Sequence, residues 1–209
     1  MINGKSILAI IPARGGSKRV PRKNLRNLAD KPMIQWTIDA AKASNFIDTL
    51  AVSTEDQAII SHCAGQQLQI VERPMELASD SANIYDAIFH AIDQFPPHDY
   101  TMLLHPTSPC RIADDIDECM ELCDSEHAPA CITIDKARPV ANGAVYVAWT
   151  TWLREFRNFD MGRVVAYEMP VNRSVDVDTM TDFAKAEQLL MERQRIMAGW
   201  SGMSRHSAG

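Results

Sequence analysis

Six basic side chains lie between Arg14 and Arg26 near the N-terminus, and five of them fall in the stretch "AIIPARGGSKRVPRKNL". The two consecutive glycines let the backbone turn tightly and approach a ligand with free N–H groups. Arg14 offers a planar fork for phosphate oxygens, and Lys18 and Lys23 offer point charges. The stretch therefore predicts a phosphate or triphosphate site. A solvated basic loop and a nucleic-acid patch are the alternatives.

The spacing of this loop matches neither common phosphate motif. A P-loop needs G-x-x-x-x-G-K-[ST] and a dinucleotide turn needs G-x-G-x-x-G, whereas the order here is Arg-Gly-Gly-Ser-Lys. Seven of the 21 Lys and Arg residues fall in the first 29 positions, which hold none of the 27 Asp and Glu residues. The remainder of the chain is acidic and repels a phosphate backbone. The charge pattern therefore favours a small polyanion over nucleic acid.

Two carboxylates lie two positions apart in "RSVDVDT", at Asp176 and Asp178. In an extended segment both side chains point to the same side. Two carboxylates held together are costly unless a cation lies between them, and Mg²⁺ prefers hard oxygen ligands shared with substrate phosphates. The pair therefore predicts a magnesium site. The alternative is that Asp178 only caps the last helix while Asp176 is solvated.

A third polar group follows the apolar run in "LLHPTSPCR". The Pro-Thr-Ser-Pro turn places Thr107, Ser108 and Arg111 at the carboxyl end of a predicted strand. The alternative is a plain strand-to-helix connection in which Thr107 or Ser108 satisfies local backbone donors.

Apolar runs with strand character alternate with segments of helical periodicity along the chain. We expect strands at residues 6–11, 49–54, 68–73, 100–106, 130–134, 143–148 and 163–169, and helices at 33–44, 55–67, 81–95, 113–124, 150–156 and 178–197, with Ser81 as the N-cap of the third helix. The alternation predicts an α/β fold whose mostly parallel sheet has helices on both faces. Ligands bind such sheets beyond the carboxyl ends of the strands, where the basic loop falls. We expect one domain over residues 1–199 and a flexible tail over 200–209.

Cellular location and partner class follow from composition. No apolar run approaches the ~18 residues that cross a membrane, and the first residues lack the apolar core of a secretory signal. The five cysteines are odd in number and lack the spacing of a disulfide framework. We therefore expect a cytoplasmic protein whose partners include neither membrane nor nucleic acid.

Taken together and in order, seven segments resemble the CMP-sialic acid synthetase (acylneuraminate cytidylyltransferase) family. The segments are "IIPARGGSKRVPRKNL", "KPMIQWTIDAA", "VSTED", "ERPMELASDSA", "LLHPTSPCR", "NGAVYVA" and "RSVDVDTMTDFAKAE". The resemblance implies a Rossmann-like nucleotidyltransferase domain. It also implies that CTP and a nine-carbon 2-keto acid sugar react with Mg²⁺ to give the CMP-sugar and pyrophosphate.

The resemblance further implies roles for individual residues. Lys18, Arg14 and Asp178 would be catalytic, with Lys18 stabilising charge at the α-phosphate. The nucleotide would be bound by Arg14, Gly15, Gly16, Ser17, Lys18, Lys23 and Asn24, with Arg14, Lys18 and Lys23 at its phosphates. Arg73, with Ser81 and Ala82, would bind its cytosine. Asp176 and Asp178 would hold Mg²⁺. The sugar would meet His105, Thr107, Ser108, Tyr146 and Phe159.

Two features depart from the family pattern. His105 stands where the family usually has glutamine, and an imidazole titrates near neutrality. The link "DKARPVA" replaces a long excursion that usually forms the dimer and brings basic residues to the partner's site, so Arg138 is a candidate substitute. We expect a monomer, or a dimer through another surface. The alternatives are a nucleotidyltransferase for another acid sugar, such as an octulosonate, and a non-catalytic nucleotide-binding module.

Overall fold

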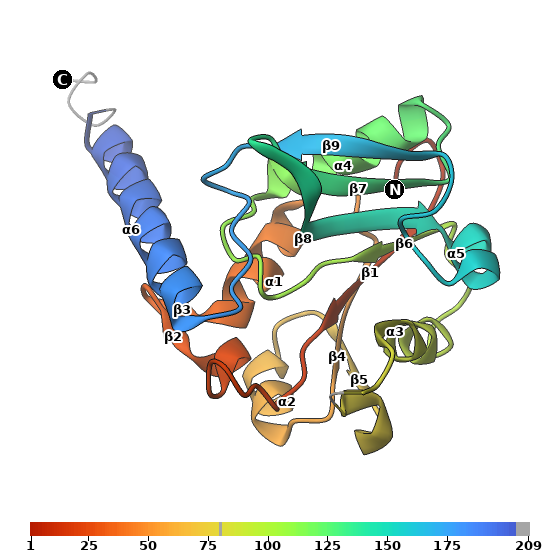
Figure 1. Cartoon of the computed structure of the whole chain (residues 1–209), viewed down its shortest axis with the longest axis horizontal. Coiled ribbons are helices and arrows are strands. Elements are labelled where there is room, and N and C mark those ends of the chain that lie inside the picture. The colour runs from red at the N-terminus through yellow and green to blue at the C-terminus, as the bar shows by residue number, and fades with distance from the viewer. Residues whose placement is uncertain (80, 204–209) are drawn as a thin grey trace.

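The computed structural model describes residues 1–79 and 81–203, and side chains as far as residue 198. Seven strands form one sheet in the order β5-β4-β1-β6-β8-β7-β9, as Figure 1 shows. The strands are β1 (Ile7–Pro12), β4 (Thr49–Thr54), β5 (Gln69–Glu72), β6 (Tyr100–Leu103), β7 (Ala130–Asp135), β8 (Arg138–Trp149) and β9 (Val164–Met169). Strand β8 runs antiparallel to both of its neighbours, and the remaining pairs are parallel. The predicted α/β fold with a mostly parallel sheet is confirmed.

Helices cover both faces of the sheet. They are α1 (Met33–Ala43), α2 (Gln57–Cys63), α3 (Ile84–Ile92), α4 (Ala113–Ser125), α5 (Thr150–Phe156) and α6 (Met180–Met203), with short 3-10 turns η1 (Lys23–Leu25) and η2 (Met75–Ala78) and a two-stranded ribbon of β2 (Asn27–Leu28) and β3 (Lys31–Pro32). Helices α1, α2 and α4 pack in one apolar cluster, whereas α3 and α5 pack in another on the opposite face. Side chains of β1 alternate between the two clusters, because successive residues of a strand point to opposite faces.

The carboxyl ends of β1, β4, β5 and β6 lie at one edge of the sheet. The ladders continue past these ends, because Ala13 N–H donates to Ser53 O at 2.9 Å and Arg73 N–H donates to Thr54 O at 3.0 Å. Leu104 N–H likewise donates to Ile10 O at 3.0 Å. The loops that follow these strands therefore start from fixed backbone positions and meet at this edge.

Helix α6 packs through Phe183, Ala186 and Leu190 against a third apolar cluster, which includes Trp36 of α1. Its later turns project away from the sheet (Figure 1). The helix continues to Met203, past the predicted end at residue 197 and into the segment assigned to a tail. Residues 204–209 lie outside the described part of the chain. No helix in the described part is long and apolar enough to span a bilayer.

Three further predictions of where elements begin or end are wrong. Asn83, not Ser81, caps α3, since its Oδ1 accepts from Tyr85 N–H at 2.9 Å and Asn, like Ser, is a strong N-cap residue. Helix α2 ends at Cys63 rather than residue 67, because Gly65 and Gln67 both adopt positive φ. Strand β8 begins at Arg138, so most of the segment predicted as a link is strand.

Between β7 and β8 only Lys136 and Ala137 remain outside the strands. Asp135 Oδ1 accepts from Ala137 N–H at 2.8 Å, which closes the turn locally. The connection is therefore a tight hairpin with no excursion.

Candidate active site

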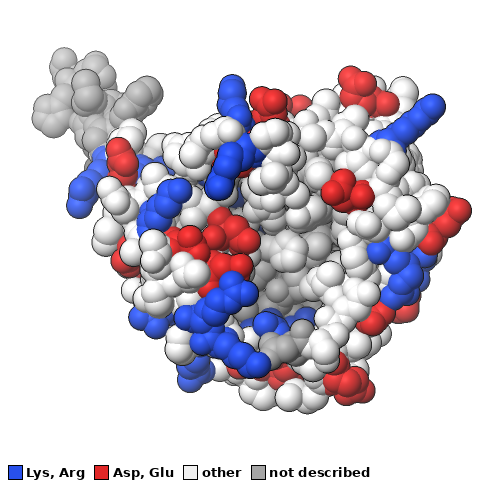
Figure 2. All heavy atoms as spheres, viewed as in Figure 1, with Lys and Arg blue, Asp and Glu red and all other residues white. Residues whose placement is uncertain are grey.

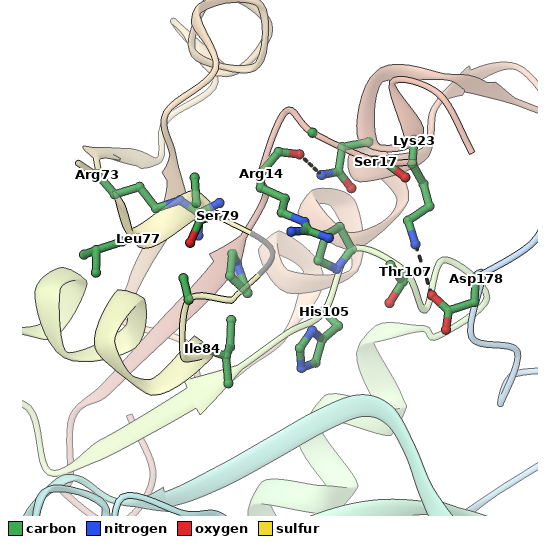
Figure 3. A pocket seen from close by; sticks show the side chains of 16 residues that line it. Arg14, Ser17, Lys23, Arg73, Leu77, Ser79, Ile84, His105, Thr107 and Asp178 are labelled. Atoms are coloured by element: carbon green, nitrogen blue, oxygen red, sulfur yellow. Dashed lines mark hydrogen bonds and ion pairs between the residues drawn. The ribbon is translucent and has the colours of Figure 1, made fainter. Parts of the chain in front are cut away.

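A cavity of about 400 Å³ opens at the carboxyl edge of the sheet. Its walls are formed by Pro12, Arg14, Gly16, Ser17, Lys23, Asn24, Arg73, Leu77, Ala78, Ser79, Ala82, Ile84, His105, Pro106, Thr107 and Asp178. Figure 2 shows a hollow on this face, with basic side chains along its lower rim and acidic side chains gathered beside it. In Figure 3, Arg73 lies on one side of the cavity, Arg14 near the middle, and Lys23 with Asp178 on the other side. Residues of all three predicted polar segments therefore share one cavity.

The two glycines of the basic loop differ in the space around them. A Cβ on Gly15 would lie 2.2 Å from Asp56 Oδ2, so only glycine fits there, whereas a Cβ on Gly16 would meet nothing within 4 Å. The prediction that Gly15 offers a free N–H is wrong, because this N–H donates to Glu55 Oε1 at 2.7 Å. Gly16 and Ser17 line the cavity, whereas Gly15 does not.

Asn24 is buried next to the loop and lines the cavity. Its Nδ2 donates to Arg14 O at 2.9 Å, which holds the start of the loop against η1. Its Oδ1 is buried and lacks a hydrogen-bond partner in the described part of the chain. An orphaned buried acceptor is costly, so a donor from a ligand would stabilise this position.

Lys23 and Asp178 form the opposite wall. Lys23 Nζ donates to Val177 O at 2.7 Å and lies 3.4 Å from Asp178 Oδ1, while Arg19 Nη1 lies 3.3 Å from Asp178 Oδ2. Val177 N–H donates to Thr107 O at 2.7 Å. The loop after β1, the turn after β6 and the segment before α6 are thereby joined around one carboxylate.

Asp176 and Asp178 alternate with buried Val175 and Val177, as predicted for an extended segment. Asp178 lines the main cavity, whereas Asp176 lines a neighbouring cavity of about 200 Å³. Protein atoms that displace water raise the pKa of Asp176. The negative charge of Asp178 acts in the same direction, and a hydrogen bond from Thr107 opposes both.

Arg73 lines the cavity although its side chain is only 3% exposed. Its Nε and Nη2 both donate to Glu55 Oε2 at 3.0 Å. The guanidinium is therefore held by a buried carboxylate on one edge while its other edge remains available to the cavity.

His105 stands at the floor of the cavity, edge-on to Tyr146 with ring centroids 5.9 Å apart. Burial lowers the pKa of His105 to about 4, and the positive charges of Arg111 and Lys23 add to this effect. The expectation that His105 titrates near neutrality is therefore wrong. At neutral pH it presents one donor and one acceptor with no charge.

Arg111 is buried beneath His105. It donates to His105 O at 3.1 Å, to Thr37 Oγ1 at 2.6 Å and to Ala144 O. Burial lowers the pKa of Arg111 to about 9, and Asp115 opposes the shift. Arg111 follows the end of β6, as predicted, but its side chain is buried and does not line the cavity. It ties the turn after β6 to α1 and β8.

Several predicted site residues do not reach the main cavity. Ser108 is fully buried and donates to Asn142 O at 3.4 Å, and Phe159 is buried in the core near Tyr146, so neither forms a wall for a sugar. Lys18 and Ser81 are exposed but lie outside the cavity lining, where Ser79 stands beside Ala82 instead. Tyr146 is half-buried behind His105.

Among the residues that sequence reasoning left out, two make charged contacts with predicted site residues. Glu55 binds both Gly15 and Arg73, and Arg19 pairs with Asp178. An acidic residue directly after a buried strand was a usable signal for Glu55, because strand ends meet the ligand in this fold. No pattern distinguished Arg19 from the other basic residues of the loop.

Comparison with known proteins gives the same family. A family model described as cytidylyltransferase matches residues 8–146. An N-acylneuraminate cytidylyltransferase of Streptococcus agalactiae serotype III is 34% identical over 212 residues, covering 84% of this chain and 51% of the relative. A CMP-N,N'-diacetyllegionaminic acid synthase of Legionella pneumophila is 28% identical, covering 91% of this chain and 99% of the relative.

The first of these relatives is much longer than this protein, and the chain spans about half the length of the N-acylneuraminate cytidylyltransferases it matches. Among solved structures, CMP:2-keto-3-deoxy-manno-octonic acid synthetase complexed with CTP is similar with a TM-score of 0.74 and 14% identity. The match covers 90% of this chain and 99% of the solved chain, and this similarity shows the fold. The resemblance drawn from the seven motifs is confirmed, and the chain belongs to the cytidylyltransferase family.

Proposed function

We propose that the protein transfers CMP from CTP to the anomeric hydroxyl of a nonulosonic, sialic-acid-like sugar and releases pyrophosphate. The observation that supports this most is the single cavity that holds Arg14, Lys23, Arg73 and Asp178 at the carboxyl edge of the sheet. Such a cavity has cationic groups for a triphosphate and a fixed guanidinium for a base. The names of the sequence relatives support an acid sugar as the acceptor.

The phosphates would lie along the loop after β1. Arg14 and Lys23 line the cavity, and Lys18 projects from the same loop, so positive charge faces the position of a triphosphate. Asn24 offers its unpartnered Oδ1 to a ligand hydroxyl. Charge that develops on the α-phosphate oxygens and on leaving pyrophosphate is stabilised by such preorganised donors.

We propose Mg²⁺ as the cofactor, bound by Asp176 and Asp178. The donor set fits, since both carboxylates are exposed and the like charge of Asp178 contributes to the raised pKa of Asp176. When bound, Mg²⁺ would neutralise phosphate charge and lower the pKa of the attacking hydroxyl. Lys23 and Arg19 pair with Asp178, and both would turn to phosphate oxygens once that carboxylate binds the metal.

The acceptor sugar would lie between His105 and Asp176. Neutral His105 can donate or accept one hydrogen bond, and Thr107 lines the same wall. Arg138 lines the neighbouring cavity together with Asp176 and Lys185. We therefore place the carboxylate of the sugar on the Arg138 side.

The proposal is tested by pyrophosphate release from CTP and Mg²⁺ against a panel of nonulosonic and octulosonic acids. We expect release with at least one nonulosonic acid and a loss of at least ~10²-fold in Asp178→Asn. Glu168→Gln, exposed on β9, is the matched control and should behave like the wild type. Binding of CTP without release for any sugar would favour a non-catalytic module, and release only with octulosonic acids would favour the other sugar class.

A further inference from the structure

Glu55 joins the loops on either side of its own strand. Strand β4 lies between β5 and β1, and Glu55 is the first residue after it. Its Oε1 accepts from Gly15 N–H at 2.7 Å, in the loop after β1. Its Oε2 accepts from Nε and Nη2 of Arg73, directly after β5, at 3.0 Å each. We call this set of hydrogen bonds the Glu55 bridge.

The Glu55 bridge is shielded from water. The side chains of Glu55 and Arg73 are 9% and 3% exposed. Glu55 does not line the main cavity, so its carboxylate acts on other protein groups. Charge-assisted hydrogen bonds of this kind are short, directional and strong when water is excluded. Both loops are therefore fixed relative to each other before any ligand arrives.

The glycine at position 15 makes the bridge feasible. Its missing side chain lets the backbone lie against Asp56, whose Oδ1 caps α2 by accepting from Ala58 N–H at 2.8 Å. Any larger residue would push the loop away from α2 and lift its N–H from Glu55. The N-terminus of α2, Glu55 and the basic loop thus form one rigid unit.

We propose that Glu55 is a positioning residue that sets the distance and orientation between the phosphate-binding loop and the base-binding Arg73. This inference rests on the proposed function, in which one nucleotide contacts both the loop after β1 and Arg73. Glu55 occupies Nε and one hydrogen of Nη2, which leaves Nη1 and the second hydrogen of Nη2 for a ligand.

A fixed guanidinium edge can discriminate between pyrimidines. Cytosine presents two adjacent acceptors, O2 and N3, whereas uracil presents a donor at N3. Two parallel N–H groups therefore favour cytosine, provided that the guanidinium cannot rotate. Without Glu55, Arg73 would be free to rotate, and the preference for cytosine would weaken more than the affinity for phosphates.

The test compares the dissociation constants of CTP and UTP by calorimetry in the full chain. Glu55→Gln keeps the size but removes the charge and one acceptor. Glu55→Asp keeps the charge but is too short to reach both loops, and it serves if the glutamine variant fails to fold. Glu72→Gln is the matched control, since Glu72 is exposed at the end of β5 and binds only Gln57 among the described residues.

We expect either Glu55 variant to lower the CTP-to-UTP affinity ratio at least about fivefold, the scale of one bidentate base contact. The Michaelis constant for CTP should rise while the turnover number changes little. A merely structural role predicts equal losses for both nucleotides, and that result would overturn the proposal, as would an unchanged ratio.

Hydrogen exchange reads the bridge without any nucleotide. Gly15 N–H and Arg73 Nε–H should exchange slowly in the wild type and at least about tenfold faster in Glu55→Gln. Unchanged exchange rates at both groups would overturn the proposal, whatever the measured CTP-to-UTP affinity ratio. A different outcome would count against the proposed function alone. In that case the wild type prefers CTP to UTP and the Glu55 variants lose this preference, but no sugar gives pyrophosphate release.

Discussion

Replacement of His105 by glutamine should remove a defined part of the pH dependence of stability. The pKa of His105 is about 4 in the folded protein, against an ordinary value of 6.5 in the unfolded chain. The unfolded chain therefore binds the proton more readily. The free energy of unfolding must fall as the pH falls from about 6.5 towards about 4.

The size of this effect follows from the two values. At pH 7 both states are mostly neutral, and at pH 5 the unfolded histidine is mostly protonated while the folded one is not. The difference is about 2 kcal/mol between pH 7 and pH 5, as an upper bound, because one pKa unit is about 1.4 kcal/mol. His105→Gln has no imidazole at this site and should lose less stability over the same range.

Urea denaturation of both proteins at pH 7 and pH 5 measures the difference directly. Titrations of all other groups are common to the two proteins and cancel in the comparison. An NMR titration of the His105 ring should give a pKa well below that of an exposed histidine. Equal losses of stability in the two proteins, or a ring that titrates near 6.5, would refute the reasoning.

Three further predictions concern turnover, the two glycines of the basic loop, and the oligomeric state. Lys18→Ala and Asp178→Ala should each lower turnover at least ~10²-fold with unchanged circular dichroism, and near-wild-type turnover in either would contradict its assignment. Gly15→Ala should lower the melting temperature by several degrees because its Cβ meets Asp56, whereas Gly16→Ala should change it little, and equal shifts would refute this. Sedimentation should show a monomer, or a dimer whose interface excludes the tight β7–β8 hairpin, and protection of that hairpin on dimerisation would contradict the expectation.

Most elements of the fold could be predicted from sequence because their signals are local. Strand β4 was predicted with its observed bounds, and α1, α4 and α5 within a residue or so. The errors lie at boundaries that depend on contacts with other elements of the fold. The short hairpin extends β8 through Arg138 because β7 offers a pairing edge, which no pattern in "DKARPVA" reveals.

The candidate site was predictable at the level of loops but not of single atoms. Arg14, Lys23, Arg73, His105 and Asp178 do share one cavity. The use of an N–H depends on tertiary contacts, so the occupied N–H of Gly15 could not be read from sequence. Burial of Ser108 and Phe159 likewise depends on packing among β8, α3 and the turn after β6.

The lowered pKa of His105 could not be predicted from the sequence either. Its pKa depends on how deeply the ring is buried and on Arg111 and Lys23, which the fold brings near it. The same holds for Arg19, which differs from its neighbours in the loop only by its position beside Asp178.

The central claim is that this cavity joins a cytidine nucleotide to an acid sugar, and mass spectrometry of the reaction product tests it most directly. After incubation with CTP, Mg²⁺ and single nonulosonic acids, we predict a product whose mass equals CMP plus the sugar less one water, formed at least ~10²-fold more slowly by Asp178→Ala. CMP or CDP as the sole nucleotide product, or a CMP-sugar formed equally well by Asp178→Ala, would contradict the account.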